Sequence, residues 1–222
     1  MSSNPVIAVD GTSGSGKSST SRGVAVRLGL RYLDTGAQFR AMTWWMLRHG
    51  VDVQDARAVA TRVGEPEIVS GTDPLGPTIT VDGEDVSVAI RQDDVNAAVS
   101  PVSAVPEVRS RLLDLQRAVI ADGGIVVEGR DIGSVVAPDA DVKVYLTADP
   151  LARAERRSAE EGGSDLAATR ESLLNRDRID AGRATAPLVM ADGAVHIDTT
   201  PFTLDEVIDQ VVALVATAEE PA

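Results

Sequence analysis

The chain has 222 residues, which is enough for one α/β domain with a buried core. It has no cysteine and no apolar run near the ~18 residues that cross a bilayer, which excludes disulfides, thiolate metal sites and membrane-spanning helices. Its net charge of −13 argues against a nucleic-acid partner and against binding to an anionic membrane surface.

A phosphate-binding loop is predicted near the start of the chain. Val6–Val9 form a short apolar run, which is typical of a strand buried in a parallel sheet. The next residues complete the pattern G-x-x-x-x-G-K-S, and a helix follows with Gly29 as its C-cap. In such a loop backbone N–H groups converge on phosphate oxygens, Lys17 reaches the terminal phosphates, and the Ser18 hydroxyl can ligate Mg²⁺. The pattern predicts a nucleoside-triphosphate site made by Gly11, Thr12, Ser13, Gly14, Ser15, Gly16, Lys17, Ser18 and Ser19.

Residues 31–34 predict a second short strand, and residues 37–47 predict a helix. Arg40 lies one turn into that helix, whose N-terminus follows the carboxyl end of the strand. Open α/β sheets bind ligands at this edge, so Arg40 is a candidate for holding a phosphate. Its position alone fits a solvated surface arginine equally well.

The pattern changes from helical to alternating between residues 64 and 95. Residues 67–69, 78–81 and 84–88 alternate like strands, and the dipeptide Asp82-Gly83 is a strong hairpin signal. A β-rich stretch inside a βαβ chain does not belong to the main parallel sheet. We therefore predict a core made of residues 1–63 and 96–222 and a small insertion, residues 64–95, over the substrate side; a loop without function is the alternative.

A third apolar strand, Ile125–Glu128, follows two predicted helices, 94–99 and 107–121. It delivers the segment Gly129–Gly133 to the carboxyl edge of the sheet. An apolar strand that ends in a carboxylate is the usual second half of a P-loop metal site, so Glu128 is a candidate to share Mg²⁺ with Ser18. Glycines on both sides of the Arg-Asp pair leave the backbone free to approach a ligand.

Two arginine-bearing helices are predicted beyond the next strand, residues 142–146. In the first, from Asp149 to about Glu161, three arginines share one face: Arg153, Arg156 and Arg157. The second spans about 165–180, after a glycine-rich break at 162–164, and leads into the aligned residues Arg176, Asp180 and Arg183. The pair suits a lid, residues 153–184, that closes over phosphates, although a solvated, salt-bridged face is the alternative.

A last strand (194–197) and a helix with the capping box Thr203–Glu206 complete the chain.

Together these motifs resemble the bacterial-type cytidylate kinases, within the nucleoside monophosphate kinase group. The matching segments cover nearly the whole chain: Asp10–Ser19, Leu33–Arg40, Asn96–Ser100 with Val108–Arg109, Gly129–Gly133, Arg153–Arg157 and Arg176–Leu188. The first segment alone identifies only a P-loop protein, whereas the Asp-Thr-Gly, Gly-Arg-Asp and Arg-Asp-x-x-Asp-x-x-Arg set is specific to this family. The resemblance implies a P-loop NTPase-type parallel sheet flanked by helices, with a small β-rich monophosphate-binding insertion and a short helical lid.

The resemblance also assigns roles to residues. By this resemblance, the phosphate of the acceptor would be bound by Arg40, Arg109 and Arg130. Its base would be bound by Thr35, Asp131 and Arg183, and its sugar by Ser100, Arg176 and Asp180. Neutralisation of the transferring phosphoryl group falls to the catalytic residues Lys17, Arg153 and Arg157. The sequence departs from the common family pattern at Thr12, Phe39 and Glu128, where Pro, Tyr and Asp are frequent.

The expected reaction is transfer of a phosphoryl group from ATP, with Mg²⁺, to CMP or dCMP, giving ADP and CDP or dCDP. The reaction needs positioning and charge neutralisation and no general base, because an acceptor phosphate is already a nucleophile. The alternatives are a kinase for another nucleoside monophosphate or a small acceptor such as shikimate, and a regulatory ATPase. We expect a cytoplasmic monomer, since the chain starts without a signal sequence and lacks an obvious exposed apolar stripe.

Overall fold

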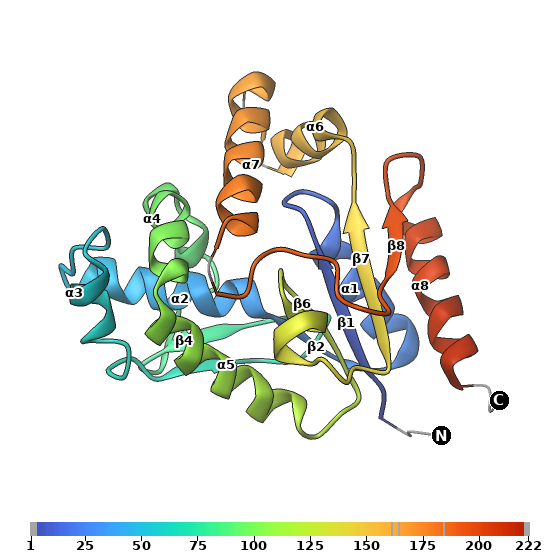
Figure 1. Cartoon of the computed structure of the whole chain (residues 1–222), viewed down its shortest axis with the longest axis horizontal. Coiled ribbons are helices and arrows are strands. Elements are labelled where there is room, and N and C mark those ends of the chain that lie inside the picture. Colours follow the sequence, from blue (N-terminus) through green and yellow to red (C-terminus); the bar gives the residue numbers. More distant parts are fainter. Residues whose placement is uncertain (1–3, 161, 164, 184, 220–222) are drawn as a thin grey trace. The chain divides into compact units, whose positions relative to one another are not determined.

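The computed structural model describes residues 4–160, 162–163, 165–183 and 185–219 (Figure 1). Positions 161, 164 and 184, which fall in the predicted lid and its glycine-rich break, lie outside the described residues. The chain divides into two compact units, one made of residues 1–30 and 123–222 and the other of residues 31–122. No helix in the described ranges has the length and apolar character needed to cross a bilayer.

The first unit holds a parallel sheet with β1 (Val6–Gly11) between β6 (Ile125–Glu128) and β7 (Val142–Thr147). Strand β8 (Val195–Asp198) pairs with the outer side of β7, again in parallel. The central strand β1 is buried almost throughout, because its apolar run lies against neighbours on both sides. The predicted parallel sheet is confirmed, and the strands end together at the edge where β1 leads into the phosphate-binding loop.

Helices flank this sheet, as predicted. Helix α1 (Lys17–Leu28) packs against α8 (Leu204–Glu219) (Figure 1). Their contact is so close that a Cβ on Gly23 would lie 2.2 Å from Ile208. Gly29 caps α1 in the left-handed conformation, and the Thr203–Glu206 capping box opens α8. The remaining elements of the unit are a π-helical turn and two packed helices: Ile132–Val136, α6 (Pro150–Glu160) and α7 (Leu166–Ala181).

The second unit has its own hydrophobic core, built around Met42, Trp45 and Leu112. Its antiparallel sheet has the order β3-β4-β5, with β4 hydrogen-bonded on both sides. Helices and strands of this unit are β2 (Arg31–Asp34), α2 (Thr35–Arg48), α3 (Ala56–Ala60), β3 (Ile68–Ser70), β4 (Ile79–Val81), β5 (Glu84–Asp85), α4 (Asp93–Ala104) and α5 (Pro106–Ile120), with a 3₁₀ turn at Ala89–Arg91. The predicted limits of the insertion, residues 64 and 95, lie inside this unit, so the division into core and insertion stays a prediction.

The predicted hairpin is confirmed, but its second strand is shorter than predicted. Asp82 and Gly83 both adopt positive φ angles, 51° and 82°, as a tight turn between antiparallel strands requires. The strand predicted over 84–88 ends at Asp85, because the Asp85 carboxylate accepts a hydrogen bond from the Ser87 N–H and turns the chain away from the ladder. The helix predicted over 94–99 is longer, running through Pro101 to Ala104.

Candidate active site

The phosphate-binding loop follows β1 and leads into α1, with glycines where the backbone demands them. Gly11 has φ 145°, and a Cβ there would lie 2.0 Å from the Leu146 carbonyl oxygen of β7. Gly14 and Gly16 also have positive φ angles, and Gly16 is the N-cap of α1. The loop is therefore a backbone cradle at a helix N-terminus, a geometry that favours anions.

Lys17 lies in this cradle and donates a hydrogen bond to the Thr12 carbonyl oxygen at 2.8 Å. The pKa of Lys17 is lowered to about 7, mainly by burial and also by the nearby charge of Arg130. The charges of Glu128 and Asp177 act in the opposite direction. Lys17 is thus a partly buried cation beside another cation, and an anionic ligand would favour its charged form.

Asp10, which the sequence analysis did not assign, holds the segment Gly129–Gly133 in place. Its carboxylate accepts hydrogen bonds from the N–H groups of Ile132, at 2.8 Å, and Gly133, at 2.7 Å. Burial raises the pKa of Asp10 to about 6, although these two hydrogen bonds oppose the shift. The signal in the sequence is a carboxylate at the end of an apolar strand, but its partners lie more than 120 residues away.

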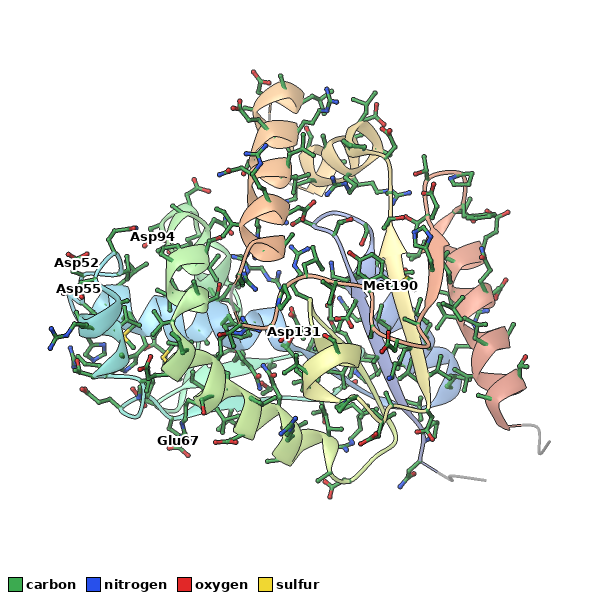
Figure 2. The ribbon with its side chains drawn as sticks, in the orientation of Figure 1. Asp52, Asp55, Glu67, Asp94, Asp131 and Met190 are labelled. Atoms are coloured by element: carbon green, nitrogen blue, oxygen red, sulfur yellow. The ribbon has the colours of Figure 1, made fainter. Side chains whose placement is uncertain are left out.

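Asp131 lies in the anchored segment, at the start of the π-helical turn (Figure 2). Its side chain is buried, and its charge contributes to the raised pKa of Asp10, which places the two carboxylates near each other. The backbone carbonyl of Asp131 accepts from Val135, at 2.9 Å, and from Val136, at 3.2 Å. The turn therefore fixes the backbone from which this carboxylate projects.

Arg130 joins the phosphate-binding loop to α7. Its Nη1 donates to the Gly11 carbonyl oxygen at 2.9 Å and lies 3.3 Å from Oδ1 of Asp177. Its Nε lies 3.2 Å from Oδ2 of Asp180, and Arg183 forms an ion pair with the same Asp180 carboxylate. The structure thus brings together three residues that the sequence predicted for the acceptor: Arg130, Asp180 and Arg183.

Arg153 reaches the loop from α6. Its Nη1 donates to the Ser13 carbonyl oxygen at 2.9 Å and also binds Asp177. The Arg153 side chain is only 5 % exposed, so a solvated, salt-bridged face, the alternative for this helix, is wrong at this position. Arg157 and Arg176 are partly buried, and the charge of Arg176 lowers the pKa of Lys17, which places it near the loop.

A cavity of about 470 Å³ lies beside the loop, and the sequence analysis did not find it. It has an apolar side formed by Phe202, Leu204 and Val207, and a polar side formed by the loop. Arg156 lines it as well, held by hydrogen bonds to the Thr199 hydroxyl and carbonyl at 2.8 Å each. Its volume and mixed lining suit a nucleoside. The complete lining is Gly14, Ser15, Gly16, Ser19, Thr20, Arg156, Thr199, Phe202, Thr203, Leu204 and Val207.

Two predicted acceptor-phosphate residues, Arg40 and Arg109, belong to the second unit and are buried there. Arg40 donates to the Ile90 carbonyl oxygen at 3.2 Å and to Oδ1 of Asn96 at 2.5 Å, so the surface-arginine interpretation is wrong. Arg109 donates to the Ser103 carbonyl oxygen at 3.2 Å and lies over the Phe39 ring, 5.2 Å from its centre. That these arginines share a phosphate with Arg130 stays a prediction.

The other predicted residues of the second unit are Thr35 and Ser100. Thr35 is the buried first residue of α2, directly after β2, whose last residue Asp34 accepts from the Ala37 N–H at 2.9 Å. Ser100 lies on α4, and its carbonyl accepts from the Ser103 hydroxyl at 3.0 Å. Their contacts with a base and a sugar stay predictions.

The predicted metal ligands occupy two different elements of the first unit. Glu128 is buried at the end of β6, in register with Val9 of β1, and Ser18 is exposed in the first turn of α1. Among the residues that the structure describes, no group of three or more His, Cys, Asp or Glu side chains gathers to hold a metal ion. A P-loop magnesium ion takes much of its coordination from phosphates and water, so a hydroxyl and one carboxylate fit that chemistry.

Comparisons with known proteins agree with the motifs. Residues 7–217 match the family model described as cytidylate kinase. The chain is 61% identical to the cytidylate kinase of Streptomyces griseus, with 96% of this chain and 93% of that protein covered. It is 47% identical to the cytidylate kinase of Mycolicibacterium paratuberculosis over the full length of both chains.

Solved structures with much lower identity share the fold. A shikimate kinase from Acinetobacter baumannii matches with a TM-score of 0.52 at 13% identity, covering 99% of this chain and 97% of its own. A gluconokinase from Sinorhizobium meliloti matches with a TM-score of 0.51 at 17% identity, and the match covers 96% of this chain and 93% of the gluconokinase. At these identities the likeness concerns the fold alone.

Proposed function

This chain belongs to the cytidylate kinase family, and from that premise we propose how it transfers a phosphoryl group from ATP to CMP or dCMP, with ADP and CDP or dCDP as products. The observation that carries the proposal is the arrangement around the phosphate-binding loop. Two guanidinium groups, from Arg130 and Arg153, are hydrogen-bonded to loop carbonyls on either side of Thr12, and Lys17, the first residue of α1, is hydrogen-bonded to the carbonyl of Thr12 itself. Three cations at one backbone cradle suit a triphosphate and a second phosphate.

The donor's phosphates would bind the loop, residues 11–19, with the nucleoside in the adjoining cavity. Phe202 and the Arg156 guanidinium offer flat surfaces for a base, and the loop supplies N–H groups for the phosphates. Arg153 and Arg157 on α6 would neutralise the transferring group together with Lys17. Their charge would offset the repulsion between two anionic substrates, which is the main obstacle to this reaction.

The acceptor would bind through three sets of residues. We assign its phosphate to Arg40, Arg109 and Arg130, its base to Thr35, Asp131 and Arg183, and its sugar to Ser100, Arg176 and Asp180. Arg40, Arg109 and Asp131 are charged side chains held away from solvent, which supports these assignments because a charge-assisted hydrogen bond to a ligand is strong in such surroundings. Cytosine presents an amino donor, which a carboxylate such as Asp131 accepts, and ring acceptors, to which Arg183 would donate.

Mg²⁺ would be held by Ser18 and the carboxylate of Glu128, directly or through water. Both supply oxygen donors, and the charge of Glu128 acts on Lys17, which places it near the phosphate-binding loop. When bound, the ion would shield the donor's phosphates. We also propose that the enzyme acts as a cytoplasmic monomer. It would have no nucleic-acid or membrane partner, which its net charge of −13 supports.

An acceptor panel tests the proposal. The purified protein would be assayed for ADP release from ATP with CMP, dCMP, UMP, AMP or shikimate, and without acceptor. We expect fast release with CMP and dCMP, slower release with UMP, and background rates otherwise. Equal rates with shikimate, or a rate that does not depend on any acceptor, would contradict the proposal.

A further inference from the structure

Asp177 makes contacts that neither the motifs nor the proposed substrate contacts account for. Its Oδ1 accepts a hydrogen bond from the backbone N–H of Ser13 at 2.9 Å and lies 3.3 Å from Nη1 of Arg130. Its Oδ2 binds Nη1 of Arg153. One carboxylate of α7 therefore binds a backbone donor of the phosphate-binding loop and two of the arginines that surround it.

The position of Asp177 on α7 directs its carboxylate toward the phosphate-binding loop. Asp177 and Asp180 are three residues apart on α7, so they lie on one face, and both bind Arg130. The helix starts at a firm cap, with the Asp165 carboxylate accepting from the N–H groups of Ala167 and Ala168. Asp177 and Asp180 therefore connect the C-terminal end of α7 to Arg130 and, through Asp177, to the phosphate-binding loop.

The three partners of Asp177 are all groups that favour phosphate oxygens. A loop N–H and two guanidinium groups form short, charge-assisted hydrogen bonds to any anion of suitable shape. The side chains concerned are largely buried: Arg130 is 15% exposed, Asp177 14% and Arg153 5%. Removing the anion without replacing it would take one carboxylate partner from each of the two arginines, Arg130 and Arg153, which is costly. This position therefore requires an anion, and in this structure Asp177 supplies it.

We propose that Asp177 is an internal latch, whose carboxylate occupies the place of a donor phosphate oxygen at the phosphate-binding loop until the nucleotide displaces that carboxylate. The inference rests on the proposed function, because it takes the loop as the donor's phosphate site. Displacement makes Arg153 available to the transferring phosphoryl group and Arg130 available to the acceptor's phosphate. Donor binding and displacement of the Asp177 carboxylate are then one exchange, and the latch weakens nucleotide affinity by competing for the same hydrogen-bond donors.

If Asp177 had a positioning role instead, its removal would change nucleotide affinity in the opposite direction. If the carboxylate served to orient Arg130 and Arg153 toward bound phosphates, its removal would weaken nucleotide binding. A competing latch, in contrast, predicts tighter binding when the carboxylate is removed. The sign of the change in affinity therefore separates the two roles.

The test compares two variants, Asp177→Asn and Asp177→Ala, with the wild type. Asn keeps the size of the side chain without its charge, and Ala favours the helix and protects against loss of folding. Glu171→Gln is the matched control, because Glu171 is an exposed carboxylate on the same helix. Calorimetric titration with ATP, ADP and AMP, without acceptor, gives the affinities. Hydrogen exchange of residues 165–183 without nucleotide reports whether the Asp177 contacts stabilise α7.

We expect both variants to bind ATP about tenfold more tightly than the wild type, with a smaller gain for ADP and none for AMP. Hydrogen exchange in α7 should be faster in the nucleotide-free variants, and Glu171→Gln should match the wild type in both measurements. Unchanged or weaker ATP binding in the variants, while the wild type binds ATP, would overturn the latch and leave the proposed function intact. A wild type that does not bind ATP would overturn both. Loss of the folded state in both variants would also overturn the latch, since it would make Asp177 a structural requirement.

Discussion

Arg156 donates two hydrogen bonds to Thr199, one from Nη1 to the hydroxyl and one from Nη2 to the carbonyl, each 2.8 Å long. The Thr199 hydroxyl in turn donates to the carbonyl of Ser15, at 3.1 Å, in the phosphate-binding loop. A residue of α6 is thereby tied to the end of β8 and, through it, to the loop. This chain of contacts forms one wall of the cavity to which we assign the donor's nucleoside.

Replacing Arg156 with Ala should therefore affect the donor more than the acceptor. The cavity would lose the planar guanidinium group that lines it and the two hydrogen bonds that hold Thr199. We therefore expect KM for ATP to rise about tenfold, which is the effect of losing one or two charge-assisted hydrogen bonds. KM for CMP should change little. Steady-state kinetics with each substrate varied in turn would measure this, with Arg170→Ala on the exposed side of α7 as the control. An equal rise in both KM values would contradict the assignment of the cavity.

The second prediction concerns the choice between cytosine and uracil. If Asp131 accepts a hydrogen bond from the amino group of cytosine, uracil would place a carbonyl oxygen against the carboxylate, and two acceptors would face each other. Asp131→Ala should lower the ratio of kcat/KM for CMP over UMP by about tenfold or more, mainly by losing activity on CMP. The exposed Asp139 offers a control substitution, Asp139→Ala, that should keep the ratio. Selectivity that survives unchanged in the Asp131 variant would show that another residue reads the base.

The third prediction follows from the buried Asp10. Its pKa in the folded protein, about 6, lies above the usual 3.8, so the folded state binds the proton more tightly than the unfolded chain does. The stabilisation from this proton is complete below pH 3.8 and is lost as the pH rises through 6. The wild type should therefore gain about 2 kcal/mol in free energy of unfolding, relative to Asp10→Asn, between pH 7 and pH 4.5.

Denaturant titrations of both proteins across this range would measure that gain. Taking the difference between them cancels the titration of the other carboxylates. A difference that does not vary with pH would mean that Asp10 is already ionised in the folded protein at low pH.

The fourth prediction is structural. Gly11→Ala would place a Cβ 2.0 Å from the Leu146 carbonyl oxygen, at a φ angle that L-residues rarely adopt. We expect a loss of about 3 kcal/mol or more in stability, from overpacking and backbone strain together. Gly64→Ala is the matched control, because nothing lies within 4 Å of a Cβ there and the φ angle is not positive. Thermal unfolding would compare the two; similar melting temperatures would contradict the close approach of β1 and β7.

The sequence predicted the local parts of this molecule well, because each has a local cause. The Asp82-Gly83 turn, the Gly29 cap and the Thr203–Glu206 capping box depend only on neighbouring residues. Strand β5 was predicted too long because a single side-chain hydrogen bond, from Ser87 to Asp85, outweighs the alternation of the segment.

The contacts that the sequence did not predict join distant segments. Asp10 binds N–H groups 122 and 123 positions away, and Asp177 binds one that is 164 positions away. Neither spacing leaves a periodic signal, since only the folded chain brings those segments together. The cavity beside the loop is of the same kind, because residues 14–20 line one side and residues 199–207 line another.

The most direct measurement of the central claim follows the phosphoryl group itself. The enzyme would be incubated with CMP and ATP labelled with ¹⁸O in the γ-phosphoryl group, and the products would be identified by mass spectrometry. The proposed function predicts one ADP for each CDP, with the label in the terminal phosphate of CDP. Labelled inorganic phosphate beside unchanged CMP would contradict it.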